Sequence, residues 1–264
     1  MTIAAGFAHK DGVLLCADTQ QETDSAKFHE AKIFRFDWKG RSGAFAFAGN
    51  SAFATSTIQR CITKIEASSE DPLSRFELVL DKEYKRVVYA HPECQTNANV
   101  HFWIIAAIPS RQGGVELYAS HETTITKEDS FKCVGIGEAL ARRIFAYSSH
   151  GGMSEHEALR VSAYALALVK KYIPSCGGPS SIMSLRHDGS IGEFNGYPEI
   201  DEIERHAGVY HMLANDLFFQ HMNSYGSEDQ FEGDIHRFVQ HVRNLRSAWV
   251  TKDKSPWGVS TPRD

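Results

Sequence analysis

The chain has 264 residues, of which 42% are hydrophobic and 23% charged, values typical of a globular protein that buries a full core. Its formal net charge of −5 and its mixed acidic and basic residues lack the basic field of a nucleic-acid-binding protein. Apolar runs reach only about 6 to 8 residues, too short to span a bilayer, and the N-terminus does not resemble a signal peptide. We therefore expect a cytoplasmic protein without a membrane or nucleic-acid partner.

The first fifty residues predict two β-hairpins. Residues 2–10 and 13–18 flank the turn signal Lys10-Asp11-Gly12, and residues 32–37 and 43–48 flank a second polar turn. The nearly continuous apolar runs indicate strands that are buried on both faces, or on one face with small residues on the other.

Helices and strands then alternate in groups. An apolar period of helical type covers residues 51–67, and Asp71-Pro72 predicts the N-cap and first residue of a helix that reaches about residue 90. Three strands are expected next, at residues 101–108, 115–120 and 130–134.

A second helix pair and a last hairpin complete the pattern. Helices are predicted at residues 138–148 and 155–172, the latter opened by the capping-box pattern of Ser154 and Glu157. The last hairpin is expected at residues 181–185 and 191–194.

This order predicts an α+β fold. Runs of strands followed by helix pairs suit two antiparallel sheets covered on both sides, a four-layer α-β-β-α sandwich. We assign residues 1–200 to this domain. Residues 201–250 are predicted to be a helical extension whose apolar stripes pack on the domain or on a neighbour, and residues 251–264 a loose tail.

Three residues of the first hairpins combine into a candidate catalytic group. Thr2 follows the initiator methionine, and a small second residue lets that methionine be removed. The hydroxyl of Thr2 would then lie beside its own terminal amine, a base with a pKa of about 7.7–8.0. Lys32 would favour the neutral amine, and Asp18 would hold Lys32 by a salt bridge. Alone, each residue has an ordinary structural explanation, and it is the combination that favours a nucleophile.

A resemblance to a known family rests on these residues and their surroundings. The ordered set Thr2-Ile3, Asp11-Gly12-Val13, Ala17-Asp18, Ala31-Lys32-Ile33 and Phe47-Ala48-Gly49 resembles the opening of proteasome β subunits and of the bacterial HslV peptidase. These are N-terminal-nucleophile (Ntn) threonine hydrolases. The resemblance extends over residues 2–195 in element order, and its motifs are concentrated in residues 2–60.

The resemblance implies roles for further residues. It implies a threonine endopeptidase in which the amide of Gly49 forms the oxyanion hole and Phe47 is the floor of the substrate pocket. Lys27 matches a lysine that lines the site or contacts a neighbouring subunit. The family's supporting Ser and Asp-x-x-Ser-Gly-Gly positions are instead occupied by Glu138, Ile173 and Cys176.

Those departures keep two alternatives open. One is a non-catalytic proteasome-like scaffold, and the other is an Ntn amidase with the same nucleophile but a small-amide substrate. The peptidase interpretation implies peptide or unfolded-protein substrates, a homo-oligomeric ring and an ATP-dependent unfoldase partner.

No cofactor or metal site is predicted. The five cysteines are odd in number and contain no CxxC pair, so they indicate neither a disulfide framework nor a thiolate site. His206 and His211, like His236 and His241, are five residues apart and would point about 140° apart on a helix. Solvated or interface histidines explain them better than metal ligands.

Overall fold

The computed structural model describes residues 2–22, 26–91, 101–148, 152–195, 198–222 and 227–252. Two antiparallel sheets form its centre, in the strand orders β10-β1-β2-β11-β12 and β5-β6-β7-β8-β9. The strands of the first sheet are β1 (Ile3–His9), β2 (Gly12–Asp18), β10 (Phe131–Gly135), β11 (Ser180–Arg186) and β12 (Ile191–Glu193). Those of the second are β5 (Ile33–Trp38), β6 (Arg41–Gly49), β7 (Phe102–Pro109), β8 (Val115–His121) and β9 (Thr124–Lys127).

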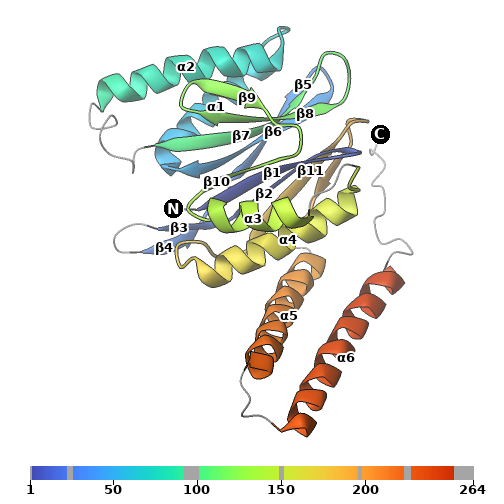
Figure 1. Ribbon diagram of the computed structural model, residues 1–264. Coiled ribbons are helices and arrows are strands. Elements are labelled where there is room, and N and C mark those ends of the chain that lie inside the picture. Colours follow the sequence, from blue (N-terminus) through green and yellow to red (C-terminus); the bar gives the residue numbers. More distant parts are fainter. Residues whose placement is uncertain are drawn as a thin grey trace. The chain divides into compact units, whose positions relative to one another are not determined.

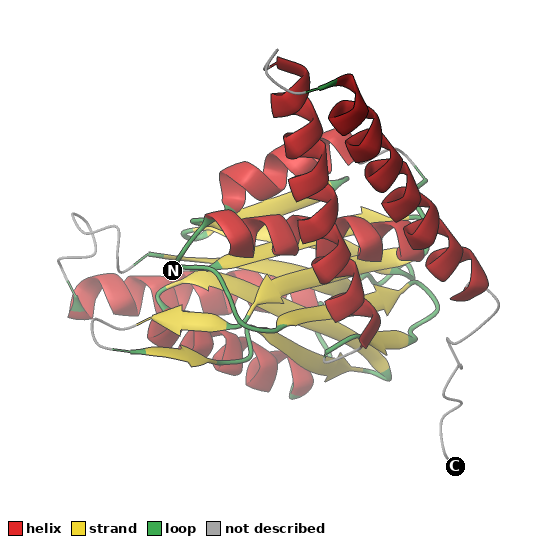
Figure 2. Cartoon of the chain, turned by 90° about the horizontal axis from the view of Figure 1, so that it is seen from below, coloured by secondary structure: helices red, strands yellow, loops and turns green. Residues whose placement is uncertain are grey.

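Helices cover the outer face of each sheet (Figure 1). The second sheet is covered by α1 (Ser51–Glu66) and α2 (Pro72–Ala90), and the first by α3 (Glu138–Ser148) and α4 (Glu155–Tyr172). Figure 2 shows the sandwich from below, with the strands lying between nearer helices and fainter, more distant ones. The predicted four-layer α-β-β-α architecture is therefore confirmed.

The alternation of small and large residues along β6 explains how the layers pack. Ala44, Ala46 and Ala48 face the first sheet, in a core shared with Leu15 and Leu117. The intervening side chains point the other way, into a second core against α1 and α2 that contains Phe36, Phe45, Phe47, Ile58 and Phe76. The strand is consequently buried on both faces, as its apolar run predicts.

The two sheets pack closely at Gly6. A Cβ added there would lie 2.5 Å from Leu117 Cδ1 and 2.8 Å from Ile105 Cγ2, both in the opposite sheet. A side chain at this position would separate the layers that carry the candidate site, so glycine is needed for the close contact.

Local signals placed most helix ends correctly. Asp71 caps α2 by accepting a hydrogen bond from the amide of Ser74, and Ser154 and Glu157 form the predicted capping box of α4. The sequence patterns missed a short ribbon of β3 (Gln20–Glu22) and β4 (Lys27–His29), and they also missed β9. These strands have three or four residues and are rich in polar side chains, so they lack the apolar alternation that marks longer strands.

The C-terminal part contains α5 (Pro198–Met222) and α6 (Glu228–Lys252). By compactness the chain divides into Met1–Glu204 and Arg205–Asp264, so the predicted boundary at residue 200 falls inside α5. Within the second unit, the rings of Tyr210 and Phe238 lie 5.4 Å apart. The predicted tail, beyond the end of α6, lies outside the described residues. None of the described helices is long and apolar enough to cross a membrane.

Candidate functional site

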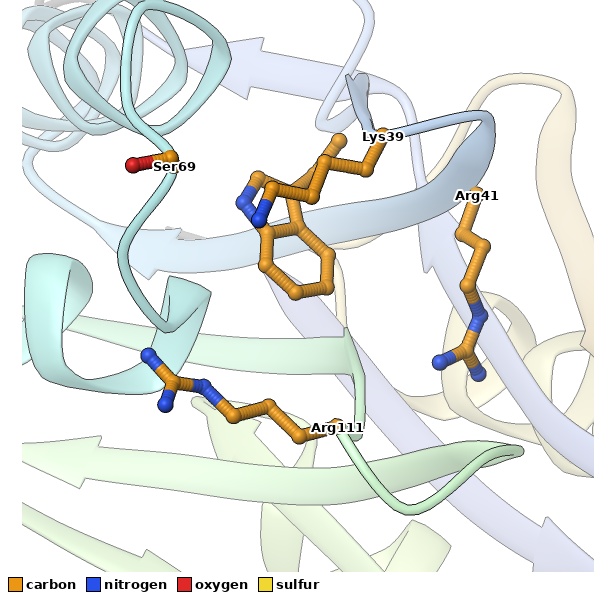
Figure 3. Close-up of a pocket in the computed structure, with 5 residues that line it drawn as sticks. Lys39, Arg41, Ser69 and Arg111 are labelled. Carbon is orange, nitrogen blue, oxygen red and sulfur yellow. The ribbon is translucent and has the colours of Figure 1, made fainter.

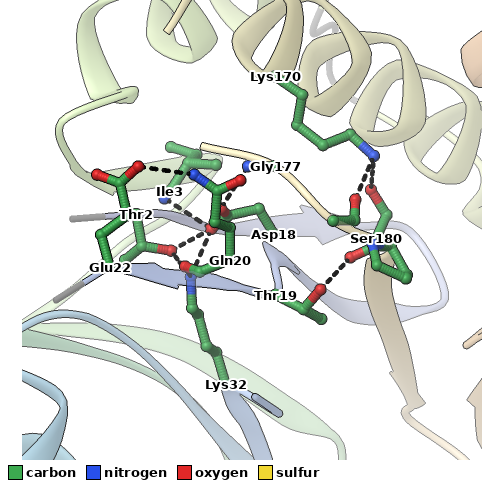
Figure 4. Close-up of polar contacts among 12 residues, drawn as sticks. Thr2, Ile3, Asp18, Thr19, Gln20, Glu22, Lys32, Lys170, Gly177 and Ser180 are labelled. Carbon is green, nitrogen blue, oxygen red and sulfur yellow. Dashed lines mark hydrogen bonds and ion pairs between the residues drawn. The ribbon is translucent and has the colours of Figure 1, made fainter. Parts of the chain in front are cut away.

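Thr2, Asp18 and Lys32 meet at one end of the two sheets (Figure 4). Thr2 directly precedes β1, and Asp18 is the last residue of β2. Antiparallel pairing of these strands, with Ala4 opposite Ala17, brings the two side chains together. Lys32 immediately precedes β5 of the other sheet, so its side chain reaches the pair from the opposite layer.

A closed set of hydrogen bonds joins the three side chains. The hydroxyl of Thr2 donates to Asp18 Oδ1 and accepts a hydrogen bond from Lys32 Nζ. Lys32 Nζ also lies 2.8 Å from Asp18 Oδ1 and 2.6 Å from the carbonyl oxygen of Gln20. The three protons of the ammonium group therefore each have an acceptor.

Backbone amides fix the carboxylate of Asp18. The amide of Ile3 donates to Oδ1 at 3.1 Å, and the amide of Gly177 donates to Oδ2 at 2.9 Å. Together with the donors from Thr2 and Lys32, these bonds give the carboxylate four hydrogen bonds, which hold its orientation.

The group is shielded from water. Asp18 and Lys32 are both 0% exposed, and Thr2 is 3% exposed. Burial lowers the pKa of Lys32, while the charge and hydrogen bond of Asp18 act in the opposite direction and favour the ammonium form. A buried lysine that contacts a hydroxyl and a carboxylate is typical of functional sites, where such perturbed groups gather.

Gly49 ends β6 on the same side of the molecule. Its φ is +101°, and an added Cβ would lie 2.3 Å from the carbonyl oxygen of His101, so glycine is required there. Amides alternate along this strand: Phe47 donates to Lys32 O on the β5 side and Asn50 donates to His101 O on the β7 side. The amide of Gly49 therefore points to the β5 side, beyond the residue at which β5 begins.

The two expected pocket residues have different environments. Phe47 is fully buried, and its ring stacks on that of Phe34 with the centroids 6.2 Å apart. Lys27 on β4 lies 2.7 Å from Glu22 and 3.1 Å from the carbonyl oxygen of Pro174. Lys27 thus links the β3–β4 ribbon to the loop after α4, outside the buried group of Thr2.

Glu138 is the first residue of α3 and is partly buried. The glycines just before it make the close contacts with the N-terminal strand. An added Cβ would lie 2.2 Å from Thr2 O at Gly135 and 3.0 Å from Ile3 Cβ at Gly137. Glycine at these two positions therefore sets the placement of Thr2.

Cys176 is 3% exposed, and it lies close enough to Asp18 and Lys32 for both charges to shift the pKa of its thiol. Burial, together with the Asp18 carboxylate, raises the pKa of its thiol to about 12, against a smaller opposing effect of Lys32. The thiol is consequently uncharged at neutral pH, and it supplies no formal charge to the site.

Two hollows differ in their position relative to the buried group. One of about 240 Å³ adjoins the buried group, since its lining includes Thr19 and Ala31, the neighbours of Asp18 and Lys32.

The other, of about 400 Å³, lies at the far end of the β5–β6 hairpin (Figure 3). Its arginines are already engaged, Arg41 with the carbonyls of Ser110 and Gly114 and Arg111 with Asp71 at 3.4 Å. We assign no role to that hollow. Within the described ranges, no group of three or more His, Cys, Asp or Glu side chains is placed to hold a metal ion.

Comparison with known proteins identifies the fold. No family model and no curated protein matches the sequence. Among solved structures, the Anbu complex of Pseudomonas aeruginosa, described as a helical assembly, superposes with a TM-score of 0.68 at 16% identity, covering 81% of this chain and 96% of that chain. Anbu (ancestral beta-subunit) from Yersinia bercovieri gives 0.68 at 11% identity, with coverages of 86% and 99%.

A Gly-1 mutant of Anbu from Hyphomicrobium sp. strain MC1 gives a TM-score of 0.66 at 13% identity, covering 86% of this chain and 99% of that chain. The chain therefore has the proteasome-like fold of these Anbu structures, with two antiparallel sheets flanked by helices, as the sequence resemblance implies. At such low identities the likeness concerns the fold, and the roles of individual residues remain predictions.

Proposed function

We propose that this protein is a threonine peptidase of the proteasome β and HslV kind, which cleaves peptide bonds with Thr2 after removal of Met1. The observation that carries the proposal is the buried group of Thr2, Asp18 and Lys32, in which a lysine donates a hydrogen bond to the candidate nucleophile. While Met1 remains attached, the nitrogen of Thr2 is an amide and cannot act as a base.

The proposed reaction begins with proton transfer. Once the amine of Thr2 is free, it takes the proton of the Thr2 hydroxyl, directly or through a water, and Oγ attacks the substrate carbonyl. The ammonium of Lys32 stabilises the negative charge on Oγ as its proton leaves, and Asp18 keeps Lys32 in place.

A tetrahedral intermediate and an ester complete the cycle. The oxyanion accepts a hydrogen bond from the amide of Gly49, a contact typically worth roughly 2.7–4 kcal/mol in the transition state. The Thr2 ammonium returns its proton to the departing amine as the C–N bond breaks, which leaves an acyl ester on Oγ. Water then attacks this ester and releases the acid and the free hydroxyl.

Substrate preference and assembly are part of the proposal. Phe47 at the floor of the pocket would favour small or flat apolar side chains, and Lys27 would line the site or contact a neighbouring subunit. We propose a homo-oligomeric ring. The helical assembly of the Anbu complex from Pseudomonas aeruginosa supports the self-association, and ring closure is the part that the resemblance implies. Peptides or unfolded proteins would be the substrates, with an ATP-dependent unfoldase as partner.

The first experiment is the intact mass of the purified protein. A mass lower by one methionine residue shows that Met1 has been removed and that the amine of Thr2 is free. The protein is then treated with a peptide epoxyketone. This class of reagent closes a ring on a hydroxyl and an amine of the same residue, so it reports an N-terminal threonine. Labelling is expected on Thr2, and Thr2→Ala is the unlabelled control.

The other outcomes separate the alternatives. Retained Met1, or a free Thr2 that neither reacts nor hydrolyses any peptide, would overturn the proposal and favour a scaffold. Labelling of Thr2 together with turnover of small acyl amides, but of no peptide, would favour the amidase.

A further inference from the structure

A second polar cluster lies beside the Gly177–Gly178 loop, whose Gly177 amide holds Asp18 (Figure 4). Lys170 on α4 donates at 3.1 Å to both the carbonyl oxygen of Gly178 and the hydroxyl of Ser180. Glu204 on α5 receives hydrogen bonds from Lys170 at Oε2 and from Ser180 at Oε1. The carboxylate of Glu204 thus links α5 to the start of β11 directly, and to the loop at Gly178 through Lys170.

Shielding from water strengthens this cluster. The side chains of Lys170 and Glu204 are 14% and 16% exposed, and Ser180 is 5% exposed. Ion pairs in such positions are less screened than surface pairs, and charge-assisted bonds are roughly twice as strong as neutral ones. The cluster is therefore able to hold the loop in one position.

The loop held in this way contacts Asp18 directly and is linked to Lys32 through Gln20. Its Gly177 amide donates to Asp18 Oδ2 at 2.9 Å, and its Gly177 carbonyl accepts the amide of Gln20 at 3.0 Å. The carbonyl of Gln20 in turn accepts Lys32 Nζ at 2.6 Å. Ser180 is also paired with Asp18 in the β2–β11 register. A shift of this loop would loosen Asp18 and Lys32 together.

We propose that Glu204, acting through Lys170 and Ser180, is a positioning residue that fixes the Gly177–Gly178 loop and thereby the orientation of Asp18 and Lys32 toward Thr2. The proposal deepens the proposed function and rests on it. Ile173 carries no polar side chain and the thiol of Cys176 is uncharged. Charged support at the Gly178 end of the loop comes from Lys170 and Glu204, whereas Lys27 holds its start at Pro174.

The test uses the processed protein and a matched control. Glu204→Gln keeps the size of the side chain and removes its charge. The control is Glu155→Gln. Glu155 lies on α4, as Lys170 does, and pairs at 2.9 Å with Arg186 on β11, the strand that Ser180 begins. This pair lies at the ends of α4 and β11 that are farther from Thr2. Glu155 is comparably shielded, with a side chain 14% exposed.

The first measurement is the rate constant for epoxyketone labelling of Thr2. We expect Glu204→Gln to lower it about tenfold, in the range found for supporting residues around other sites, and Glu155→Gln to change it less than about twofold. Lys170→Met is expected to match Glu204→Gln, and the double variant to lose no more than either, because both act through one contact. Equal losses in Glu204→Gln and Glu155→Gln at equal melting temperatures would overturn the proposal.

The pH dependence of labelling gives a readout that general destabilisation does not move. Lys32 faces the charges of Asp18 and Glu30 and the thiol of Cys176. If Asp18 is loosened, Lys32 loses its main stabilising charge, so the alkaline limb of the labelling profile moves to lower pH in Glu204→Gln. An unmoved limb in that variant contradicts the proposal.

Hydrogen exchange separates this proposal from the proposed function. Exchange at the Gly177 amide requires no catalysis, and we expect it to be at least tenfold faster in Glu204→Gln than in Glu155→Gln. If Thr2 of the wild-type chain does not react, the peptidase proposal fails, and the exchange result still decides whether Glu204 holds the loop.

Discussion

The carboxylate of Asp18 and the ammonium of Lys32 are both fully buried, so each charge depends on the other in the folded chain. Removing one partner of a buried pair leaves an uncompensated charge, which typically costs about 3–5 kcal/mol. We expect Asp18→Asn to lower the free energy of unfolding by about this amount, as measured by urea denaturation.

Two further variants make that prediction specific. Asp18→Asn combined with Lys32→Met should be more stable than Asp18→Asn alone, because no buried charge is then left unpaired. Asp81→Asn removes the exposed partner of Lys85 and should change stability far less than Asp18→Asn does. A loss in Asp18→Asn as small as that in Asp81→Asn would contradict the assigned ion pair.

The lowered pKa of Lys32 predicts the alkaline limit of activity. The amine of Thr2 must be neutral, so activity should rise with pH up to about 7.7–8.0, or lower where the ammonium of Lys32 depresses the pKa of the amine. Activity should then fall as Lys32 loses its proton, at a pH below the value of about 10.4 for an ordinary lysine. Initial rates of peptide cleavage from pH 6 to about 11, with circular dichroism to check folding, test this. A plateau extending past about 10.4 in folded protein would be the contrary result.

Residue spacing predicted side chains of the site better than its backbone groups. Thr2, Asp18 and Lys32 are recognisable because their chemistry is carried by side chains at fixed positions in the chain. The carbonyl of Gln20 and the amide of Gly177 complete the hydrogen bonding of the same group, yet any residue supplies such atoms, so the sequence carries no sign of them. Glu204 was missed because its partners lie 24 and 34 residues away, at spacings that follow no local rule.

At the scale of elements, the turn between β10 and α3 sets the position of Thr2 just before β1. Gly135 has a φ of +99°, and an added Cβ would lie 2.2 Å from the carbonyl oxygen of Thr2. Gly40, in the β5–β6 turn, has a φ of +74° and nothing within 4 Å of such a Cβ. Substitutions at both glycines introduce backbone strain, but only a substitution at Gly135 also clashes with Thr2. Comparing the two variants therefore distinguishes strain from displacement of the nucleophile.

We expect Gly40→Ala to cost about 1–2 kcal/mol, the strain of a left-handed residue, without changing Thr2 labelling. Gly135→Ala should cost clearly more and should lower the labelling rate at least tenfold, because the clash moves Thr2 itself. Urea denaturation and epoxyketone labelling of both variants provide the measurements. Equal effects of the two substitutions on labelling would show that this turn does not position Thr2.

Elements with strong local signals were predictable, and those that depend on distant partners were not. The first residues of α2 and α4 can be predicted from Asp71 and from the Ser154–Glu157 capping box, because these caps need no tertiary contact. The strands β3 and β4 exist because they pair with each other, and β9 because it pairs with β8. Their three or four residues are too few to show a period, so the sequence patterns did not reveal them.

At the scale of the whole molecule, large apolar side chains remain exposed on both outer layers of the sandwich. Leu78 and Tyr89 on α2 are 59% and 85% exposed, and Tyr147 on α3 is 82% exposed. Exposed apolar side chains that lie together on a surface mark association sites. Because α2 and α3 cover different sheets, contacts between them would join unlike surfaces of neighbouring copies, an arrangement that closes into rings or continues as a helix.

Leu78→Glu therefore tests the proposed assembly. A charge in an apolar contact loses its hydration, so self-association should weaken at least about tenfold. Sedimentation velocity over a range of concentrations measures this, with Ala90→Glu as a control that adds the same charge at an exposed site on the same helix, about 120° around the helix axis from Leu78. Wild-type chain that remains monomeric at all concentrations would remove the assembly proposal. An oligomer that survives Leu78→Glu unchanged would place the contact elsewhere.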